Sequence, residues 1–172
     1  MATPAPPVRT GSSGIVSVHE ADPRFVLKGY EVWQGGRCTH GFGRVEDSRA
    51  TLEVEHDVYQ RLGPHPAILE YHGREEVREG VYSLKLERAK GDLRSSMTTR
   101  PPPAEQTQLG MAIQAASAMT HMHSKGVFHC DFSCRNTFLF DDWLVKVGDF
   151  GGSKIDDRQP LGTEEVRYEL PL

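Results

Sequence analysis

Two short motifs in the second half of the chain constrain its fold and chemistry more than any other feature. The first is H-x-D-x-x-x-x-N, from His129 to Asn136, and the second is D-F-G, which begins at Asp149, 18 positions after Asp131. Six fixed residues in this order arise by chance in a chain of 172 residues with a probability on the order of 10⁻⁴ or less. The alternative is that Asp131 and Asn136 only cap turns.

This pair of motifs resembles the catalytic loop and the metal-binding loop of the protein kinase family. The resemblance implies a two-lobe α+β fold and phosphoryl transfer from ATP, with Mg²⁺ as the metal. It also implies that Asp131 orients the substrate hydroxyl and accepts its proton, and that Asn136 and Asp149 bind the two Mg²⁺ ions. Amide and carboxylate oxygens are the hard ligands that Mg²⁺ prefers.

Two positions of the catalytic loop depart from the family's pattern. Cys130 stands where the family has an arginine that receives a phosphorylated activation loop, so control by loop phosphorylation is in doubt. Ser133 replaces the lysine of serine/threonine kinases, whereas Arg135, four places after Asp131, resembles the tyrosine-kinase pattern. The resemblance implies that Arg135 supplies the cation near the γ-phosphate, and it leaves open whether the acceptor is serine, threonine or tyrosine.

A carboxylate interrupts the apolar stripe of the helix predicted at residues 48–62. Glu55 falls at helical spacing within this stripe, which predicts a buried acid that needs a cation or strong donors nearby. Lys28, in the V-x-K sequence of a predicted strand, resembles the family's strand lysine. By this resemblance Lys28 pairs with Glu55, and the pair holds the α- and β-phosphates. The alternative places Glu55 on a solvated helix face and buries His56 and Asp57 instead.

The family's glycine-rich phosphate loop is matched only in part. Gly11 matches the first glycine and Val18 the later valine, but Ser13 and Val16 stand where the family has its second and third glycines, with Gly14 between them. Backbone N–H groups of such a loop still fit phosphate, although close approach is less easy without those glycines. A plain Gly-Ser linker is the alternative.

The resemblance also implies an adenine site. The segment after Leu86 is similar to the hinge whose backbone binds adenine, which assigns Glu87 and Ala89 to the nucleotide. Val18 and Val26 are then expected on one face of the ring and Phe138 on the other.

The predicted elements differ between the two halves of the chain, which indicates an α+β fold of two lobes: an antiparallel small lobe with one helix, and an incomplete helical large lobe. We expect a flexible tail at residues 1–10 and a kinase-like domain at 11–172, with a small lobe at about 11–88 and a partial large lobe at about 89–172. The predicted elements are strands at 15–18 and 24–28, a loop at 34–43, a helix at 48–62, strands at 67–72 and 81–87, a helix at 104–124, and a hairpin at 137–140 and 144–147.

Composition narrows the environment and the partners. A net charge of -4 and a pI of about 6.1 argue against general attraction to nucleic acids or acidic membranes. No apolar run approaches the roughly 18 residues of a transmembrane helix, and the N-terminus lacks the layout of a signal peptide. Three cysteines cannot build a disulfide framework and fit a reducing compartment. We therefore expect an intracellular, cytoplasmic chain that binds neither nucleic acid nor membrane.

A rival set of zinc-type ligands lies close to the catalytic motif. It contains His121, His123, His129, Cys130 and Cys134. No C-x-x-C pair is present, and two histidines two positions apart on a helix point to different faces. We therefore expect His129 to pack against Phe150 and the two cysteines to fill space in the loop.

The resemblance stops short of the whole family domain. Only residues 152–172 follow the D-F-G motif, and they contain no A-P-E. The helices absent here normally cover the helix at 104–124, so we expect its apolar stripe to be exposed and to favour self-association or a partner. The chain also resembles small fungal protein-kinase-like sequences, at residues 65–73, 129–131 and 149–156.

Three hypotheses follow from this sequence. The first is a protein kinase that transfers phosphate from ATP to a serine, threonine or tyrosine hydroxyl of a protein. The second is a truncated, nucleotide-binding pseudokinase or scaffold. The third is a small atypical kinase of the KEOPS-subunit type.

Overall fold

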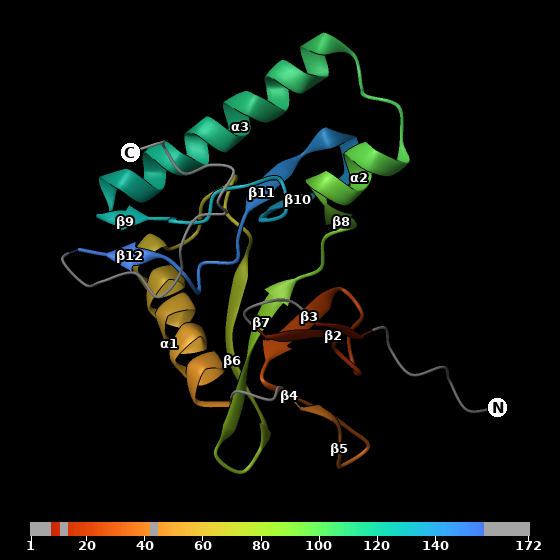
Figure 1. Ribbon diagram of the computed structural model, residues 1–172, viewed down its shortest axis with the longest axis vertical. Helices are drawn as coiled ribbons and strands as arrows, with labels where there is room; N and C mark the ends of the chain where they lie inside the picture. Colours follow the sequence, from red (N-terminus) through yellow and green to blue (C-terminus); the bar gives the residue numbers. More distant parts are fainter. Residues whose placement is uncertain (1–7, 11–13, 42–44, 157–172) are drawn as a thin grey trace, which may run out of the picture. The chain divides into compact units, whose positions relative to one another are not determined.

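The computed structural model describes residues 8–10, 14–41 and 45–156 (Figure 1). Contacts divide the chain into two units. Unit 1 holds the residues up to His56 together with Glu70–Arg88, and unit 2 holds Asp57–Leu69 together with the residues from Ala89 onward. Helix α1 (Val45–Leu62) therefore begins in unit 1 and ends in unit 2.

Unit 1 is built on a five-stranded antiparallel sheet with the strand order β1-β2-β3-β7-β6. The strands are β1 (Val8–Thr10), β2 (Ile15–Val18), β3 (Phe25–Gly29), β6 (Tyr71–Arg78) and β7 (Val81–Glu87). Strand β3 lies in the middle, where Lys28 is paired with Val16 on one side and with Leu84 on the other. A central strand is held on both edges by ladder hydrogen bonds, so Lys28 has a well-defined position.

Strand β1 and the start of β6 differ from the prediction. Residues 1–10 were expected to form a flexible tail, but Val8–Thr10 pairs antiparallel with β2. This pairing uses backbone groups of a short segment, which leave no periodic pattern in the sequence. Residues 1–7 lie outside the described residues. Of the segment predicted as a strand at 67–72, Tyr71 and His72 belong to β6, whereas Ile68 forms an isolated bridge with Val147.

A separate hairpin follows β3. It consists of β4 (Glu31–Gln34) and β5 (Arg37–Gly41). The prediction of a loop at 34–43 was therefore wrong for Gln34 and for residues 37–41, and correct for the turn at Gly35 and Gly36. Gly35 and Gly36 have φ of 55° and 74°, the conformation of a two-residue hairpin turn whose twist matches the flanking strands. Arg78 of β6 donates to Glu31 over 3.0 Å and anchors the hairpin.

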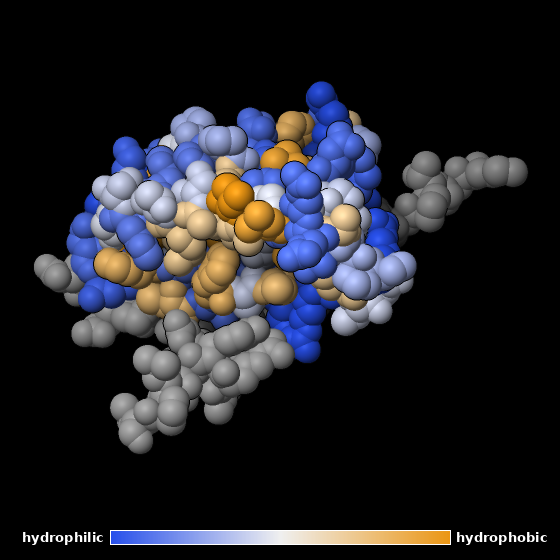
Figure 2. All heavy atoms as spheres, turned by 90° about the horizontal axis from the view of Figure 1, so that it is seen from above, coloured by the Kyte–Doolittle hydropathy of each residue, from blue (hydrophilic) through white to orange (hydrophobic). Residues whose placement is uncertain are grey.

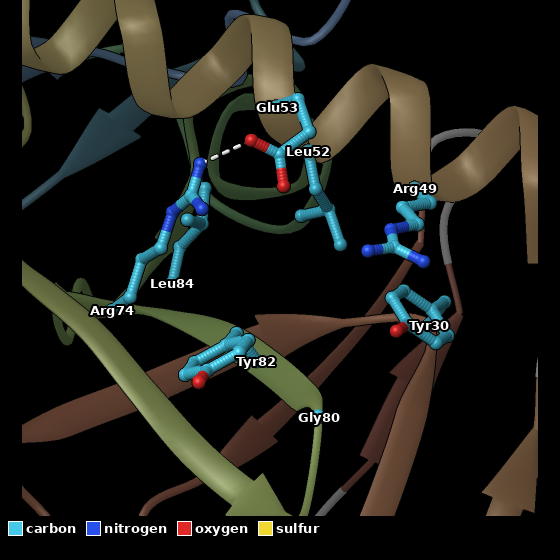
Figure 3. A pocket seen from close by; sticks show the side chains of 8 residues that line it. All are labelled: Tyr30, Arg49, Leu52, Glu53, Arg74, Gly80, Tyr82 and Leu84. Atoms are coloured by element: carbon cyan, nitrogen blue, oxygen red, sulfur yellow. Dashed lines mark hydrogen bonds and ion pairs between the residues drawn. The ribbon is translucent and has the colours of Figure 1, made fainter.

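Helix α1 packs on the sheet of unit 1. Leu52 from the helix and Leu84 from β7 line a small pocket of about 30 Å³ between the two elements (Figure 3). Arg74 of β6 donates a hydrogen bond to Glu53 across this gap. Apolar contact and an ion pair thus hold the helix to the sheet. The other lining residues are Tyr30, Arg49, Gly80 and Tyr82.

Unit 2 combines two further helices with short strands. Its elements are β8 (Gly91–Asp92), α2 (Leu93–Thr99), α3 (Glu105–Ser124), β9 (Val127–Phe128), β10 (Thr137–Leu139), the 3₁₀ turn η1 (Asp141–Trp143), β11 (Val145–Val147) and β12 (Lys154–Ile155). Strands β11, β10 and β8 form one sheet, and β12 pairs with β9. Met111 of α3 packs with Leu139 and Val145 in a buried core.

The two helices of unit 2 show what sequence patterns reveal. Helix α3 was predicted at 104–124, within one residue of its position. Helix α2 was not predicted, because its serines and threonines are weak helix formers. Its one sequence signal is Asp92, which caps the helix by accepting from the Ser95 N–H over 2.7 Å. Among the residues that the structure describes, no helix has both the length and the apolarity to cross a membrane.

One face of α3 carries exposed apolar side chains. Leu109 and Ile113 are 59% and 61% exposed, whereas Met111, Ala118 and Met122 on the other side are buried. Figure 2 shows hydrophobic side chains gathered on the surface seen from above, the side on which α3 lies in Figure 1. The exposed stripe expected from the sequence is therefore present.

Candidate active site

Lys28 and Glu55 form a buried ion pair in unit 1. The Lys28 Nζ lies 2.6 Å from Glu55 Oε2, and the two side chains are 6% and 0% exposed. Glu55 shares the buried face of α1 with Leu52, whereas Asp57 is exposed and His56 is half-buried. The alternative in which His56 and Asp57 are buried in place of Glu55 is not observed. Because both side chains are removed from solvent, the attraction between the two charges helps to offset the cost of burying them. The pair therefore fixes α1 to β3.

A second contact beside this pair was not foreseen. His56 follows Glu55 on α1, and its Nδ1 lies 2.6 Å from the Tyr71 hydroxyl of β6. Burial raises the pKa of Tyr71, so its hydroxyl stays protonated and is able to donate. A histidine one position from a buried acid is a weak sequence signal, and a partner 15 positions away cannot be read from periodicity.

Three of the residues assigned to adenine and phosphate lie on or next to strands β2 and β3 of unit 1. Val18 and Val26 are register partners on β2 and β3, both half-buried. Gly14 is buried next to β2, while Gly11 lies outside the described residues. These positions of unit 1 come together on neighbouring strands of one sheet.

The segment predicted to be the hinge follows β7. The Glu87 N–H donates to the Glu70 carbonyl over 3.0 Å, and the Glu87 carboxylate accepts from the Glu70 N–H over 2.7 Å. These bonds fix the backbone just before Ala89, which begins the second segment of unit 2. Phe138 is half-buried on β10 of unit 2, opposite Asp92.

The catalytic-loop motif is organised around two buried polar side chains. His129 is 2% exposed; its Nε2 donates to the Gly148 carbonyl over 3.1 Å, and its Nδ1 accepts from the Asp131 N–H over 3.3 Å. Asn136 is 6% exposed; its Nδ2 donates to the Asp131 carbonyl and to Asp131 Oδ2 over 2.8 and 2.9 Å. The carboxylate of Asp131 is thus held by its own loop. Arg135 is exposed in the same loop.

The D-F-G motif is anchored to the catalytic loop inside unit 2. The Gly148 N–H donates to the Asn136 carbonyl over 3.0 Å, immediately before Asp149. Phe150 is fully buried, with its ring 5.0 Å from that of Tyr59 and 5.3 Å from that of His129. The predicted packing of His129 on Phe150 is therefore confirmed. Asp149 has φ of 62°, an uncommon conformation for a non-glycine residue, and such strain is often found at functional sites.

The donor set of unit 2 fits Mg²⁺. The Asn136 nitrogen is used in its two bonds to Asp131, so its oxygen is the amide atom that can bind a cation. With the Asp149 carboxylate this provides hard oxygen ligands, which Mg²⁺ prefers over nitrogen or sulfur.

The candidate zinc ligands are engaged elsewhere. His121 stacks on His65 with ring centroids 4.3 Å apart, and His123 lies 5.2 Å from Phe128. Cys134 is exposed, and Cys130 contacts the Phe128 carbonyl through its sulfur. Within the described part of the chain, no three His, Cys, Asp or Glu side chains gather in a way that could hold a metal ion.

Stability should fall in mild acid because of His129. Burial lowers the pKa of His129 below its usual 6.5, more than the Gly148 carbonyl and Asp149 raise it. Below about pH 6.5 the unfolded chain therefore binds a proton that the folded chain excludes, so stability that is full above this pH is lost as the pH falls, by up to about 1.4 kcal/mol per pH unit. Urea unfolding between about pH 5 and 7.5 measures this slope.

The control for this slope is His129→Gln, which keeps an N–H for the Gly148 carbonyl. Burial and His121 also lower the pKa of His65, so the wild type and the variant share that contribution. Only the difference between their slopes reports His129, and equal slopes would contradict the prediction.

Comparison with known proteins identifies the family of this chain. The family model for protein tyrosine and serine/threonine kinases matches residues 43–170. This chain belongs to the protein kinase family. The match includes Glu55 and both motifs of unit 2, and it begins after Lys28. The family generally uses ATP and Mg²⁺.

Curated relatives agree with this family. Mitogen-activated protein kinase kinase kinase 20 of Arabidopsis thaliana is 33% identical over 111 residues, which is 59% of this chain and 32% of the relative. A serine/threonine-protein kinase-like protein of the same plant is 31% identical over 118 residues, 65% of this chain and 34% of the relative. The kinase kinase kinase bck1 of Aspergillus fumigatus is 30% identical over 115 residues, 66% of this chain and 7% of the relative. The chain spans about a third of the length of the first two relatives.

These findings confirm two predictions made from the sequence, the protein kinase family and the α+β fold class with an antiparallel sheet in its first unit. These relatives are named as kinases or kinase-like proteins.

Proposed function

We propose that this chain is the catalytic part of a protein kinase that transfers the γ-phosphoryl group of ATP to a protein hydroxyl. The observation that carries the proposal is the buried Lys28–Glu55 ion pair. Burying two charges costs several kcal/mol per ion, and apolar residues of similar volume often serve stability as well or better. Stability alone does not account for burying this pair. A role for the Lys28 ammonium in binding phosphate does.

Most of the residues proposed to bind the nucleotide belong to unit 1, and two of them, Ala89 and Phe138, belong to unit 2. Lys28, oriented by Glu55, interacts with the α- and β-phosphates. The backbone N–H group of Gly14 would approach the phosphates, and the apolar side chains of Val18 and Val26 would contact adenine; Gly11, the other glycine assigned to the phosphates, lies outside the described residues. The backbone of Glu87 and Ala89 donates and accepts at the adenine edge, and Phe138 supplies a further apolar contact. We further propose that residues 11–88 and 89–172 form the two lobes of one kinase-like domain, except that residues 57–69 belong with the second unit.

The residues of unit 2 would carry the chemistry. When bound, Mg²⁺ neutralises phosphate charge, and Asn136 and Asp149 would hold it through oxygen. Asp131 orients the substrate hydroxyl and accepts its proton, while Arg135 offers positive charge to the transferred phosphoryl group. The relative named as a serine/threonine-protein kinase-like protein favours serine or threonine as the acceptor. Three free thiols support a reducing, cytoplasmic location.

A thermal-shift experiment tests nucleotide binding. Millimolar ATP with Mg²⁺ is expected to raise the melting temperature of the chain, because a ligand that binds only the folded state stabilises it, by about 2.7 kcal/mol at 100 times its Kd. Asp149→Asn removes a metal ligand and should remove most of the shift. Asp142→Asn, at an exposed carboxylate of η1, is the matched control and should keep it. No shift for the wild type would reject nucleotide binding.

The exposed face of α3 supports a contact with a second copy of the chain. Leu109 and Ile113 lie four positions apart on this helix and are both mostly exposed. We expect Leu109→Gln with Ile113→Gln to shift the chain toward monomer in sedimentation velocity, with little change in stability since exposed sites are usually within about 0.5 kcal/mol. A wild type that stays monomeric at high concentration would reject self-association. The exposed apolar side chains of α3 would then be explained by contact with a different partner.

A further inference from the structure

Arg61, on the last turn of α1, contacts two other segments of unit 2. Its Nη1 and Nη2 donate to Asp156 Oδ1 and Oδ2 over 3.2 and 2.9 Å. Nη1 also donates to the carbonyl of Lys125, in the turn after α3, over 3.3 Å. The two parallel bonds to one carboxylate form the bidentate arrangement that the planar guanidinium favours. One side chain thus joins α1, the turn after α3 and the segment that follows D-F-G.

Asp156 is held in place by more than this ion pair. It follows β12, which pairs antiparallel with β9, and its N–H donates to the Gly126 carbonyl over 3.0 Å. A Cβ on Gly126 would lie only 2.8 Å from Asp156 Oδ1, and Gly126 has φ of 69°. Only glycine therefore lets the carboxylate approach the turn this closely. The chain from Asp149 to Asp156 is closed against the turn that leads into β9.

The consequence concerns Asp149. The segment is anchored at one end by the packing of Phe150 and the Ser153 hydroxyl, which donates to the His129 carbonyl over 3.2 Å. Its other end is held by Asp156. Misplacement of a reacting group by about 1 Å can cost two orders of magnitude in rate, so control of this segment matters for a metal ligand at its start.

We propose that Arg61 and Asp156 are positioning residues for phosphoryl transfer, which hold the segment that carries Asp149 against the turn after α3. This rests on the proposed function above. The pair is well exposed, with side chains 43% and 57% accessible, so solvent screens it and it contributes little to global stability. Its role is to order one segment, and the loss of that order can be measured apart from unfolding.

The test is a double-mutant cycle with Arg61→Gln, Asp156→Asn and the double variant. Asparagine tolerates the left-handed conformation of residue 156, which has φ of 51°. In each single variant we expect faster amide hydrogen exchange at residues 149–156 and a kcat about threefold to tenfold lower, with KM for ATP and the melting temperature nearly unchanged. The double variant should be no worse than either single variant, because the second change removes a partner already lost.

Two controls make the result decisive. Arg24→Gln breaks the exposed ion pair of Arg24 with Asp22 in unit 1, removes the same charge and should change neither exchange at 149–156 nor kcat. Arg61→Lys keeps the positive charge but cannot make two parallel hydrogen bonds to the carboxylate. Its kcat and its exchange rate at residues 149–156 should therefore lie between those of the wild type and Arg61→Gln. Unchanged exchange in both single variants, or additive losses in the double variant, would overturn the proposal. Hydrogen exchange can be measured on an inactive protein. It therefore tests whether Arg61 and Asp156 order residues 149–156 even if the wild-type chain fails to bind Mg-ATP and the proposed function is rejected.

Discussion

Glutamine in place of Glu55 is expected to lower the free energy of unfolding by about 3–5 kcal/mol. Lys28 Nζ lies 2.6 Å from the carboxylate, and both side chains are almost wholly buried. In the variant, the Lys28 ammonium stays buried without the Glu55 carboxylate, so this carboxylate no longer offsets the cost of its desolvation. Urea unfolding at neutral pH, followed by tryptophan fluorescence, measures the loss.

Two further variants separate charge from packing. Glu53→Gln changes a carboxylate on the same helix that is 53% exposed and pairs with Arg74, so we expect a loss below about 1 kcal/mol. Lys28→Met combined with Glu55→Leu replaces the pair by apolar side chains and should regain much of the stability, but not phosphoryl transfer. A Glu55→Gln variant as stable as the wild type would contradict a buried charge pair.

Asparagine in place of Asp131 is expected to lower the rate of phosphoryl transfer by about 10²–10⁴-fold, because an amide cannot accept the proton of the substrate hydroxyl. Asn136 donates to the Asp131 side chain and backbone carbonyl. The variant keeps an oxygen to accept the side-chain bond, so the loop should remain folded. Autophosphorylation and transfer to a degenerate serine/threonine peptide library measure the rate.

This variant also separates an enzyme from a scaffold. It should keep the thermal shift with Mg-ATP, since Asp131 is not assigned to the metal, and Asp142→Asn should keep both the shift and the rate. Full activity of Asp131→Asn would remove Asp131 from the reaction. A wild type that binds Mg-ATP but phosphorylates neither itself nor any peptide would support the scaffold hypothesis instead.

Local patterns predicted the helices that have strong periodicity. α1 and α3 repeat apolar residues at helical spacing, so their existence and their ends, within about three residues, followed from the sequence. The acid at position 55 was informative because it broke that periodicity. A charge on a core-facing stripe requires a partner, and the partner is Lys28.

Other elements have no such pattern. Every residue of β5 is exposed, so alternation of apolar and polar residues is missing, and only the Gly35-Gly36 turn could have indicated the hairpin. Strand β1 is three residues long and depends on backbone pairing with β2. Short elements of this kind are stabilised by their neighbours, and composition gives no sign of them.

Motif spacing and periodicity are local properties of the chain, so they were sufficient to predict the protein kinase resemblance, the α+β class, and the candidate residues for nucleotide binding, metal binding and proton transfer. Three contacts could be found only in the folded molecule: Tyr71 with His56, Asn136 with Asp131 through two bonds, and Arg61 with Asp156, 95 positions away. Hydrogen bonds and ion pairs require particular distances and directions, and only the folding of distant segments against one another can provide these.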